Sequence, residues 1–291
     1  MKNKRLIAIL AALVILVCGG FAGYKFYTHE RNQSRGIALL QEEVKQLSAE
    51  NRNLRSDFEN LSETVDSLHE AVNLLSAEIQ NKIAWTDDAF NYLAIGNSIT
   101  RHGRASYWWN NANGMAASDA EHDYFHLVLR HLEEKHGKVH GETAGLSTWE
   151  VKSHDRDEML TLLNPWMNEK IDLITIQLGE NTDELETFEA DFVSLIQHIK
   201  AQCPKARVIV IGDFWECGGR DAMKMAAAEQ TGVEYVSLEG IKGNPEYYCG
   251  MGTTVYDEEG NAHTVNHDGV AVHPGDRGMQ AIAERVIALD P

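Results

Sequence analysis

The segment from residue 83 to residue 291 predicts an α/β domain in which helices cover both faces of a parallel sheet. Short apolar runs with strand character recur through it, at residues 92–95, 139–144, 171–178, 207–211 and 233–238. Amphipathic helical patterns fall between or after these runs, at residues 125–134, 185–201, 221–231 and 279–289. Strands that alternate with helices in this way are typical of a parallel sheet covered on both faces.

The individual runs differ in strength. Residues 92–95 and 207–211 are almost wholly apolar, as expected of strands buried on both faces, whereas residues 139–144 form the weakest of the five runs,. Residues 239–269 break the alternation and are rich in Gly, Asn and Tyr. This segment predicts a surface loop with a small hairpin that turns at Glu259-Gly260-Asn261.

The first 27 residues predict a basic cytoplasmic tip followed by a transmembrane signal anchor. Residues 1–5 read Met-Lys-Asn-Lys-Arg, and no charged side chain occurs from Leu6 to Tyr24. About 20 apolar residues are needed to cross the hydrocarbon core, and the basic end stays in the cytoplasm. We therefore expect a single-pass protein of the cell membrane whose remaining residues are extracellular. The alternative is a cleaved signal peptide with a small-residue site at residues 20–22.

Residues 28–82 predict a coiled-coil stalk. From Ile37 to Ile79 apolar residues recur at alternating steps of three and four, with mostly β-branched residues at a positions and leucine at every d position. This combination favours a parallel two-stranded coiled coil. Asn51 supports that interpretation, because one buried asparagine at an a position specifies register and strand number. We expect a parallel homodimer; the alternative is a lone amphipathic helix that lies on its own domain.

The charge balance argues against one class of partner. The formal net charge is −18, and the acidic residues are spread through the stalk and the domain. No basic stripe is present, so we expect no nucleic-acid partner.

Apart from Cys18 the chain has Cys203, Cys217 and Cys249, an odd number that cannot all pair within one chain. A bridge between Cys217 and Cys249 is left open.

Three polar residues occupy positions where a parallel sheet binds ligands. Ser98 follows the first predicted strand, within Gly96-Asn97-Ser98-Ile99-Thr100. Asn181 follows the strand at 171–178, and His273 precedes the last helix. Ligands bind at the carboxyl edge of such sheets. A serine there is a nucleophile when a histidine takes its proton and fixed donors hold an oxyanion, although a serine after a strand is also a common turn or cap residue.

The blocks around Ser98, Gly145, Asn181 and His273, in that order, resemble those of the SGNH (GDSL-type) hydrolase family. The resemblance covers residues 91–289 and rests on the stretches Ile95-Gly96-Asn97-Ser98-Ile99-Thr100, Gln177-Leu178-Gly179-Glu180-Asn181-Thr182 and Val272-His273-Pro274-Gly275. Asn97 and Thr182 stand where the family usually has aspartate. The resemblance implies a flavodoxin-like three-layer α/β/α fold with the site at the carboxyl edge of the sheet.

The resemblance also implies a role for each matching residue. Ser98 would attack an ester carbonyl, with His273 as general base and then general acid. The oxyanion would be held by the backbone N–H of Ser98, by a backbone N–H of the second block and by the Asn181 side-chain amide. Within the second block, Thr143-Ala144-Gly145-Leu146-Ser147-Thr148, we expect Gly145 to be the donor. The spacing also allows Ser147 or Thr148.

The third member of a catalytic triad is the largest departure from the family. The family usually carries an aspartate three residues before the histidine, where this chain has Val270. Asp268 is the nearest upstream acid, and we expect it to reach back to His273. The alternatives are a backbone carbonyl or another acid, because a valine side chain cannot form a hydrogen bond.

Two further groups of residues bear on ligands. Trp108 and Trp109 lie in the long connection after Ser98, and we expect them to bind substrate by stacking on sugar faces; the alternative is that they cover the core. The residues His263, His267, Asp268 and His273 raise the rival idea of a metal site, but their spacing matches no ligand pattern. We expect neither a metal nor a cofactor.

These observations predict a membrane-anchored serine esterase. It would remove O-acyl groups, acetyl above all, from an extracellular or cell-surface carbohydrate through an acyl-enzyme on Ser98. One alternative is an O-acyltransferase that passes the acyl group to a surface glycan. Others are a non-catalytic stalked module that binds a glycan or a protein partner, and a chain whose coiled coil is itself the functional element.

Overall fold

A computed structural model describes residues 85–152 and 154–291, residues 39–55, and the positions 16, 18–21, 25, 31, 36 and 58. Its contacts divide the chain into two compact units, Met1–Asn73 and Leu74–Pro291. No helix within the described ranges combines the length and hydropathy needed to cross a membrane. The predicted anchor, Leu6 to Tyr24, lies largely outside those ranges, so the anchor and the boundaries at residues 27 and 82 stay predictions.

In the N-terminal unit, residues 39–55 are helical. The side chains of Leu40, Val44, Leu47 and Leu54 are exposed in the single chain. A helix in a single chain does not distinguish the predicted coiled-coil stalk from a lone helix, so the stalk stays a prediction. The rest of the repeat lies almost entirely outside the described residues, and the pairing of two chains stays a prediction.

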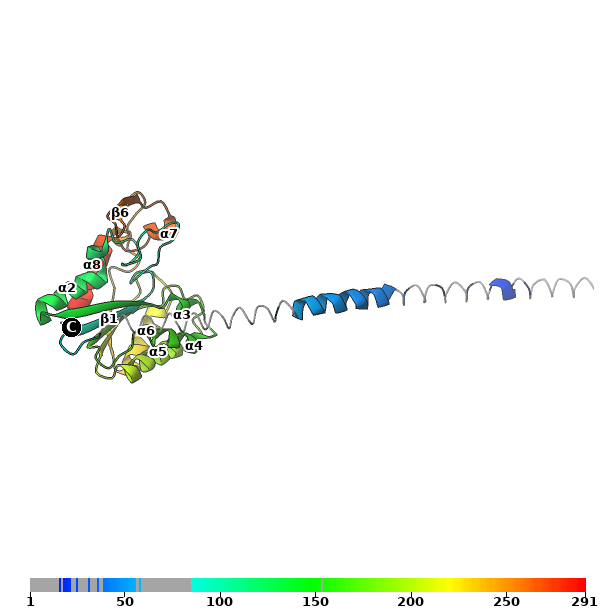
Figure 1. Cartoon of the computed structure of the whole chain (residues 1–291), viewed down its shortest axis with the longest axis horizontal. Helices are drawn as coiled ribbons and strands as arrows, with labels where there is room; N and C mark the ends of the chain where they lie inside the picture. The colour runs from blue at the N-terminus through cyan, green and yellow to red at the C-terminus, as the bar shows by residue number, and fades with distance from the viewer. Residues whose placement is uncertain are drawn as a thin grey trace, which may run out of the picture. The chain divides into compact units, whose positions relative to one another are not determined.

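The C-terminal unit is built on a five-stranded parallel sheet (Figure 1). Its strands are β1 (Phe90–Gly96), β2 (Val139–Gly145), β3 (Leu173–Gln177), β4 (Arg207–Ile211) and β5 (Glu234–Val236). Their order is β2-β1-β3-β4-β5, which is the flavodoxin-like order, and every neighbouring pair is parallel,. Gly96 is in register with Gly145 on one side and Gln177 on the other. The strands β1, β2 and β3 therefore end level at the edge where such sheets bind ligands.

Helices cover both faces of this sheet, because successive strand residues point to opposite sides. Leu93 and Ile95 pack into one core, together with α5 (Phe188–Gln202) and α6 (Arg220–Thr231). Tyr92 and Ala94 pack into the other, together with α2 (Tyr124–His136) and α8 (Asp276–Ile287). Figure 1 shows the two helix pairs on opposite sides of the sheet. The predicted α/β class and the parallel sheet with two covered faces are confirmed.

Local signals set the ends of the longer helices. The Asp123 side chain accepts a hydrogen bond from the His126 backbone N–H at 2.7 Å and caps the start of α2,. Gly137 and Gly232 end α2 and α6 with φ values of 82° and 68°, a conformation that glycine adopts without a Cβ penalty,. The apolar periodicity predicts none of the short elements α3 (Ser147–Val151), α4 (Arg156–Met159), α7 (Asp268–Ala271) and the 3-10 turns Ala120–His122, Leu160–Leu163 and Pro245–Tyr247.

The segment after β5 contains the predicted hairpin. Its strands β6 (Thr254–Tyr256) and β7 (Ala262–Thr264) are antiparallel. Val255 and Val265 pack with Trp108, Val270 and Ala271 in a small core of their own. This satellite core joins the connection after Ser98 to the segment that carries His273.

The cysteines are separate thiols. Cys18, Cys203, Cys217 and Cys249 are all unbridged, so the open question of a Cys217–Cys249 bridge is answered in the negative. Burial raises the pKa of the Cys203 thiol, and burial raises that of Cys249 as well. Since the thiolate is the reactive form, neither of these two cysteines is poised as a nucleophile.

Candidate active site

Ser98 lies in a tight turn directly after β1. A side chain at Gly96 would collide with Thr100 Oγ1 and with the backbone of β3, so only glycine fits there. The Asn97 side-chain Oδ1 accepts a hydrogen bond from the Ile99 backbone N–H at 3.0 Å, and the Asn97 carbonyl accepts one from the Thr100 N–H at 3.0 Å. The first bond makes an Asx turn and the second closes a β-turn. The turn leaves Ser98 partly exposed between two buried neighbours at the carboxyl edge of the sheet.

The imidazole of His273 meets the Ser98 hydroxyl. Ser98 Oγ and His273 Nε2 are 2.8 Å apart, and His273 Nδ1 is 2.6 Å from the Gly269 carbonyl oxygen. A carbonyl oxygen only accepts, so the proton sits on Nδ1 and Nε2 is free to accept from Ser98. This is the tautomer that a general base requires.

The structure corrects the expected role of Asp268. Asp268 is exposed at the start of α7, and its side chain forms no hydrogen bond or ion pair with any residue in the described ranges. Val270, where the family resemblance expects the acid, is buried in the satellite core. A helix of four residues leaves carbonyl oxygens without intrahelical partners, and Gly269 offers one of them to the imidazole,. The backbone, instead of an acid, orients His273.

Trp215 covers the imidazole of His273. Their ring centroids are 4.8 Å apart at an interplanar angle of 80°, and Trp215 Nε1 donates to the Val272 carbonyl at 3.0 Å. Burial lowers the pKa of His273 to about 4; the hydrogen bond to Gly269 opposes this shift, and the charge of His102 adds to it. His273 is therefore neutral, and able to accept a proton, well below neutral pH.

We expect kcat/KM for ester hydrolysis by the full chain to hold on acidification from about pH 8 to about pH 5, because the neutral base persists above a pKa of about 4,. An unburied histidine would lose this form below about pH 6.5. A pH profile with p-nitrophenyl acetate checks this, with activity measured again at neutral pH after each acid exposure. Trp215→Ala should move the acidic limb toward about pH 6.5. A wild-type limb already near that value would contradict the prediction.

Ser98 and His273 open into a cavity of about 790 Å³. This volume lies within the usual range for small-molecule sites, about 300–1,000 Å³. Gly145, Ser147 and Asn181 line the same cavity. Its other lining residues are Arg101, His102, Gly103, Tyr107, Met115, Glu142, Thr143, Trp166, His267, Gly269 and Val270. The four blocks of the family resemblance therefore meet at one hollow.

Gly145 and Asn181 reach the cavity from the ends of β2 and β3, the two strands that flank β1. Gly145 ends β2, and a Cβ there would meet open space, so the cavity is unobstructed at that point. Asn181 follows Gly179, whose φ of 123° suits glycine,. The Thr182 N–H donates to the Gly179 carbonyl at 3.0 Å and closes the turn. Within the second block, Ser147 also lines the cavity and Thr148 does not, so two of the three candidates for the backbone donor lie beside the site.

The structure corrects the expected role of Trp108 and Trp109, which do not line the cavity. Trp108 is only 1% exposed and lies in the satellite core. Trp109 stacks on His263, with ring centroids 4.6 Å apart and an interplanar angle of 10°. Burying large aromatic rings is strongly favourable, which explains the core position. The aromatic residues that do line the cavity are Tyr107 and Trp166.

The histidines of the segment 263–273 have different partners. His263 Nε2 lies 2.8 Å from Asp257 Oδ2, and His267 stacks on Tyr107 with centroids 4.7 Å apart. His273 is bound to Ser98. Across the part of the chain that the structure describes, no three His, Cys, Asp or Glu side chains converge as metal ligands. The rival metal site is thus not assembled from these residues.

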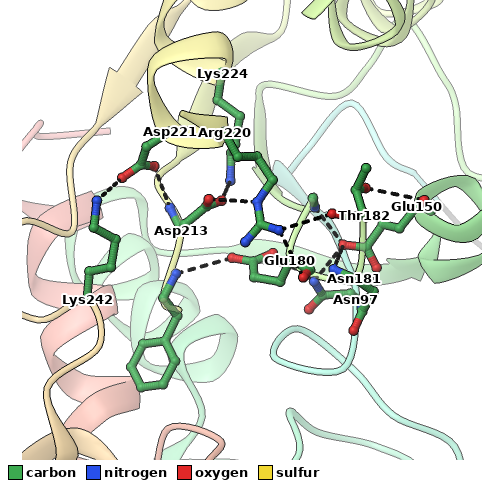
Figure 2. Close-up of polar contacts among 12 residues, drawn as sticks. Asn97, Glu150, Glu180, Asn181, Thr182, Asp213, Arg220, Asp221, Lys224 and Lys242 are labelled. Carbon is green, nitrogen blue, oxygen red and sulfur yellow. Dashed lines mark hydrogen bonds and ion pairs between the residues drawn. The ribbon is translucent and has the colours of Figure 1, made fainter. Parts of the chain in front are cut away.

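Two glutamates that bind Asn97, the buried Glu150 and the half-buried Glu180, were not among the predicted site residues (Figure 2). Asn97 Nδ2 donates to Glu150 Oε1 at 2.9 Å and to Glu180 Oε2 at 2.8 Å. An aspartate at position 97 would bring a third carboxylate to this point and could not donate to either glutamate when ionised,. The only signal in the sequence is position: Glu150 follows the second block and Glu180 lies within the third, each after the end of a predicted strand.

A buried ion cluster lies next to Glu180. Asp213 Oδ2 is 2.7 Å from Arg220 Nε, and Asp213 Oδ1 is 3.0 Å from Lys224 Nζ. All three side chains are nearly inaccessible to solvent. Burial, together with the Asp213 and Glu150 carboxylates, raises the pKa of Glu180 to about 7 against the opposing charges of Lys224 and Arg220. Glu180 therefore titrates near neutral pH.

We expect Glu180→Gln to flatten the dependence of stability on pH. A carboxyl whose pKa is raised on folding holds more protons in the folded state, so it stabilises the fold below its unfolded pKa and this contribution is lost as pH rises through about 7,. Urea midpoints at about pH 5 and pH 8 check this: wild type should lose more stability between them than the variant. Glu133→Gln, at an exposed position of α2, is the matched control. Equal losses in wild type and Glu180→Gln would contradict the prediction.

No protein-family model matches the sequence, and no curated protein matches it. Among solved structures, the chain is similar to a two-domain esterase (CEX) active on acetylated mannans, at 18% identity over 69% of this chain and 48% of that one, with a TM-score of 0.44. The chain thus spans about half the length of that protein. An acetyl xylan esterase from Geobacillus stearothermophilus has 18% identity over 69% of this chain and 95% of that one, with a TM-score of 0.41.

A third solved structure resembles the chain to a similar degree. A family two carbohydrate esterase from Clostridium thermocellum, in complex with cellohexaose, has 15% identity over 69% of this chain and 63% of that one, with a TM-score of 0.41. Likenesses this distant concern the fold alone. The chemistry of the site has to be argued from the residues of this chain.

Proposed function

We propose that the chain is a serine esterase of the SGNH hydrolase type. The observation that carries the proposal is the 2.8 Å contact between Ser98 Oγ and His273 Nε2, made in a cavity that Asn181 also lines. His273 takes the hydroxyl proton as Ser98 Oγ attacks the ester carbonyl carbon. The proton that His273 already carries on Nδ1 stays there, hydrogen-bonded to the Gly269 carbonyl.

The remaining steps use the same groups. Attack moves negative charge to the former carbonyl oxygen, which the Asn181 amide, the Ser98 N–H and the Gly145 N–H would stabilise. His273 then gives its proton to the departing alcohol oxygen, and the acyl group stays on Ser98. Water attacks this acyl-enzyme while His273 takes its proton, which releases the carboxylic acid and restores the serine.

An acylated carbohydrate is the proposed substrate class, with acetyl as the acyl group. A cavity of about 790 Å³ accommodates much more than an acetyl group,. The cavity wall includes the aromatic side chains of Tyr107 and Trp166 and the charged side chains of Arg101 and Glu142. A sugar presents both apolar ring faces and hydroxyl groups, so this mixed lining supports the choice.

The proposal extends to location and assembly. The uncharged stretch from Leu6 to Tyr24 behind a basic tip supports a single-pass anchor with the domain extracellular,. The heptad pattern from Ile37 to Ile79 supports a parallel homodimer,. Light scattering of the full chain in detergent should give a dimer, and external protease should cleave the domain from intact cells. A monomer, or a domain protected from protease, would contradict these parts of the proposal.

The esterase is tested with the full chain and two substrates, p-nitrophenyl acetate and acetylated oligosaccharides. We expect acetate release from both, and a fluorophosphonate should stop it by modifying Ser98, as located by peptide mass spectrometry. Ser106, an exposed serine nearby in the chain, should stay unmodified. A folded chain that is neither labelled nor active would contradict the proposal and favour a binding module. Acetyl transfer to an added sugar in preference to water would favour the acyltransferase.

A further inference from the structure

We infer that Glu150 is a positioning residue of this site, which holds the Asn181 side-chain amide with one N–H directed at the oxyanion. The inference rests on the proposed function, in which Asn181 is an oxyanion donor. Glu150 lies on α3, the short helix that follows β2, and only 1% of its surface is exposed. It does not line the cavity itself, so any effect on the reaction acts through its neighbours.

The Glu150 carboxylate is shared between two turns that flank the site (Figure 2). Oε2 accepts a hydrogen bond from Asn181 Nδ2 at 2.5 Å. Oε1 accepts from the Gly179 backbone N–H at 2.6 Å and from Asn97 Nδ2 at 2.9 Å. One side chain from the element after β2 therefore joins the turn after β1, which carries Ser98, to the turn after β3, which carries Asn181.

The donor capacity of Asn181 gives this contact its consequence. A side-chain amide has two N–H hydrogens on one nitrogen and a separate acceptor oxygen. One N–H is bound by Glu150, and because Asn181 lines the cavity, the other is left for an oxygen atom of a ligand. The carboxylate also decides which way the amide faces, since its oxygens can only accept. If the amide turned over, Asn181 Oδ1 would face the oxyanion and repel it.

The burial of Glu150 argues against a purely structural role, because burying its charge costs free energy. A buried carboxylate costs free energy unless hydrogen bonds replace its hydration. Here the donors that replace it are Asn97, Gly179 and Asn181, all from the turns of the site. The alternative is that Glu150 only stabilises these turns, and a double-mutant cycle separates the two roles.

The cycle uses the full chain and p-nitrophenyl acetate. Asn181→Ala should lower kcat about 10²- to 10³-fold, the usual loss of one oxyanion donor. Glu150→Gln keeps the size of the side chain but replaces an acceptor oxygen with an N–H donor, and it should lower kcat about 10- to 100-fold with KM little changed. In the Asn181→Ala background it should lower kcat less than about 3-fold, because the group through which Glu150 acts is gone.

Asp221→Asn is the matched control. Asp221 is another partly buried carboxylate of the polar network in Figure 2. It binds Lys242 at 2.6 Å and Tyr235 at 2.8 Å, and none of its contacts among the described residues is with Asn181. Its effect on kcat should be the same in both backgrounds. If the effect of Glu150→Gln is also the same in both, or falls on KM, Glu150 supports only the fold and the inference is overturned.

A second measurement does not depend on activity. In chain labelled with ¹⁵N-asparagine, we expect the two Asn181 side-chain amide protons to be widely separated in the NMR spectrum, because one is bound to a carboxylate. Asn181→Ala assigns them, and Glu150→Gln should collapse the separation. If Glu150→Gln collapses the separation but the wild-type chain has no esterase activity, the esterase proposal fails while the contact between Glu150 and Asn181 is confirmed. An Asn181 amide unaffected by Glu150→Gln overturns the inference whatever the activity.

Discussion

Replacing Ser98 or His273 with alanine is expected to lower kcat for p-nitrophenyl acetate on the order of 10⁴- to 10⁶-fold. Each change removes one end of the 2.8 Å contact between Ser98 Oγ and His273 Nε2. Without Ser98 there is no nucleophile. Without His273 the hydroxyl proton has no acceptor, and a serine at its own pKa is a weak nucleophile. Stopped assays over hours, with spontaneous hydrolysis subtracted, measure losses of this size.

The two residues act as one unit, so their losses should not multiply. The double variant should be about as slow as the slower single variant, since the residual rate comes from binding and the oxyanion donors. Asp268→Asn is the control: its side chain binds no described residue, and its activity should stay close to wild type. A large loss in Asp268→Asn would restore Asp268 as the orienting acid, and an active Ser98→Ala would exclude the serine mechanism.

The layers of the fold could be predicted because they rest on local periodicity. The run at residues 207–211 is β4 without change, and the weak run at 139–144 is β2 with one residue added. Both are short strands whose neighbours in the chain are helical. The helices α3, α4 and α7 could not be found in this way, because four or five residues do not complete enough turns for a periodic pattern,.

Some residues of the site could likewise be predicted from the sequence, and others could not. Ser98, Asn181 and His273 could be selected because strand ends meet at one edge of a parallel sheet, and the structure brings all three to one cavity. The Gly269 carbonyl could not be selected, because a backbone oxygen leaves no mark in the sequence and depends on where α7 ends. Glu150 was hidden for a similar reason, since its burial depends on how α3 turns after β2.

The tryptophans illustrate a further limit. A pair of aromatic residues in a loop fits a sugar platform and a core equally well when only sequence is available. The hairpin β6–β7 decides between the two, because Val255 and Val265 come from far along the chain to cover Trp108. Tyr107, the residue before Trp108, faces the cavity instead.

The second large effect concerns stability: Asp213→Ala is expected to lower the free energy of unfolding by about 3–5 kcal/mol. Asp213 is the partner of two buried cations, Arg220 at 2.7 Å and Lys224 at 3.0 Å. Without its carboxylate both cations keep the cost of leaving water and lose the nearest charge that offsets it. Urea unfolding of the full chain, followed by tryptophan fluorescence, measures the change. Asp88→Ala is the control: it breaks an ion pair with Lys138 in which the Asp88 side chain is 72% exposed and the Lys138 side chain 62% exposed, and it should have little effect,.

The reason for the loss can be tested separately from its size. If an unpaired cation is the cause, Lys224→Met in the Asp213→Ala background should recover part of the stability, because methionine fills similar space without a charge. Asp213 also raises the pKa of Glu180, so Asp213→Ala should lower that pKa and weaken the loss of stability between about pH 5 and pH 8,. A loss below about 1 kcal/mol, or no recovery with Lys224→Met, would mean that water reaches the cations and that this cluster is not buried in solution.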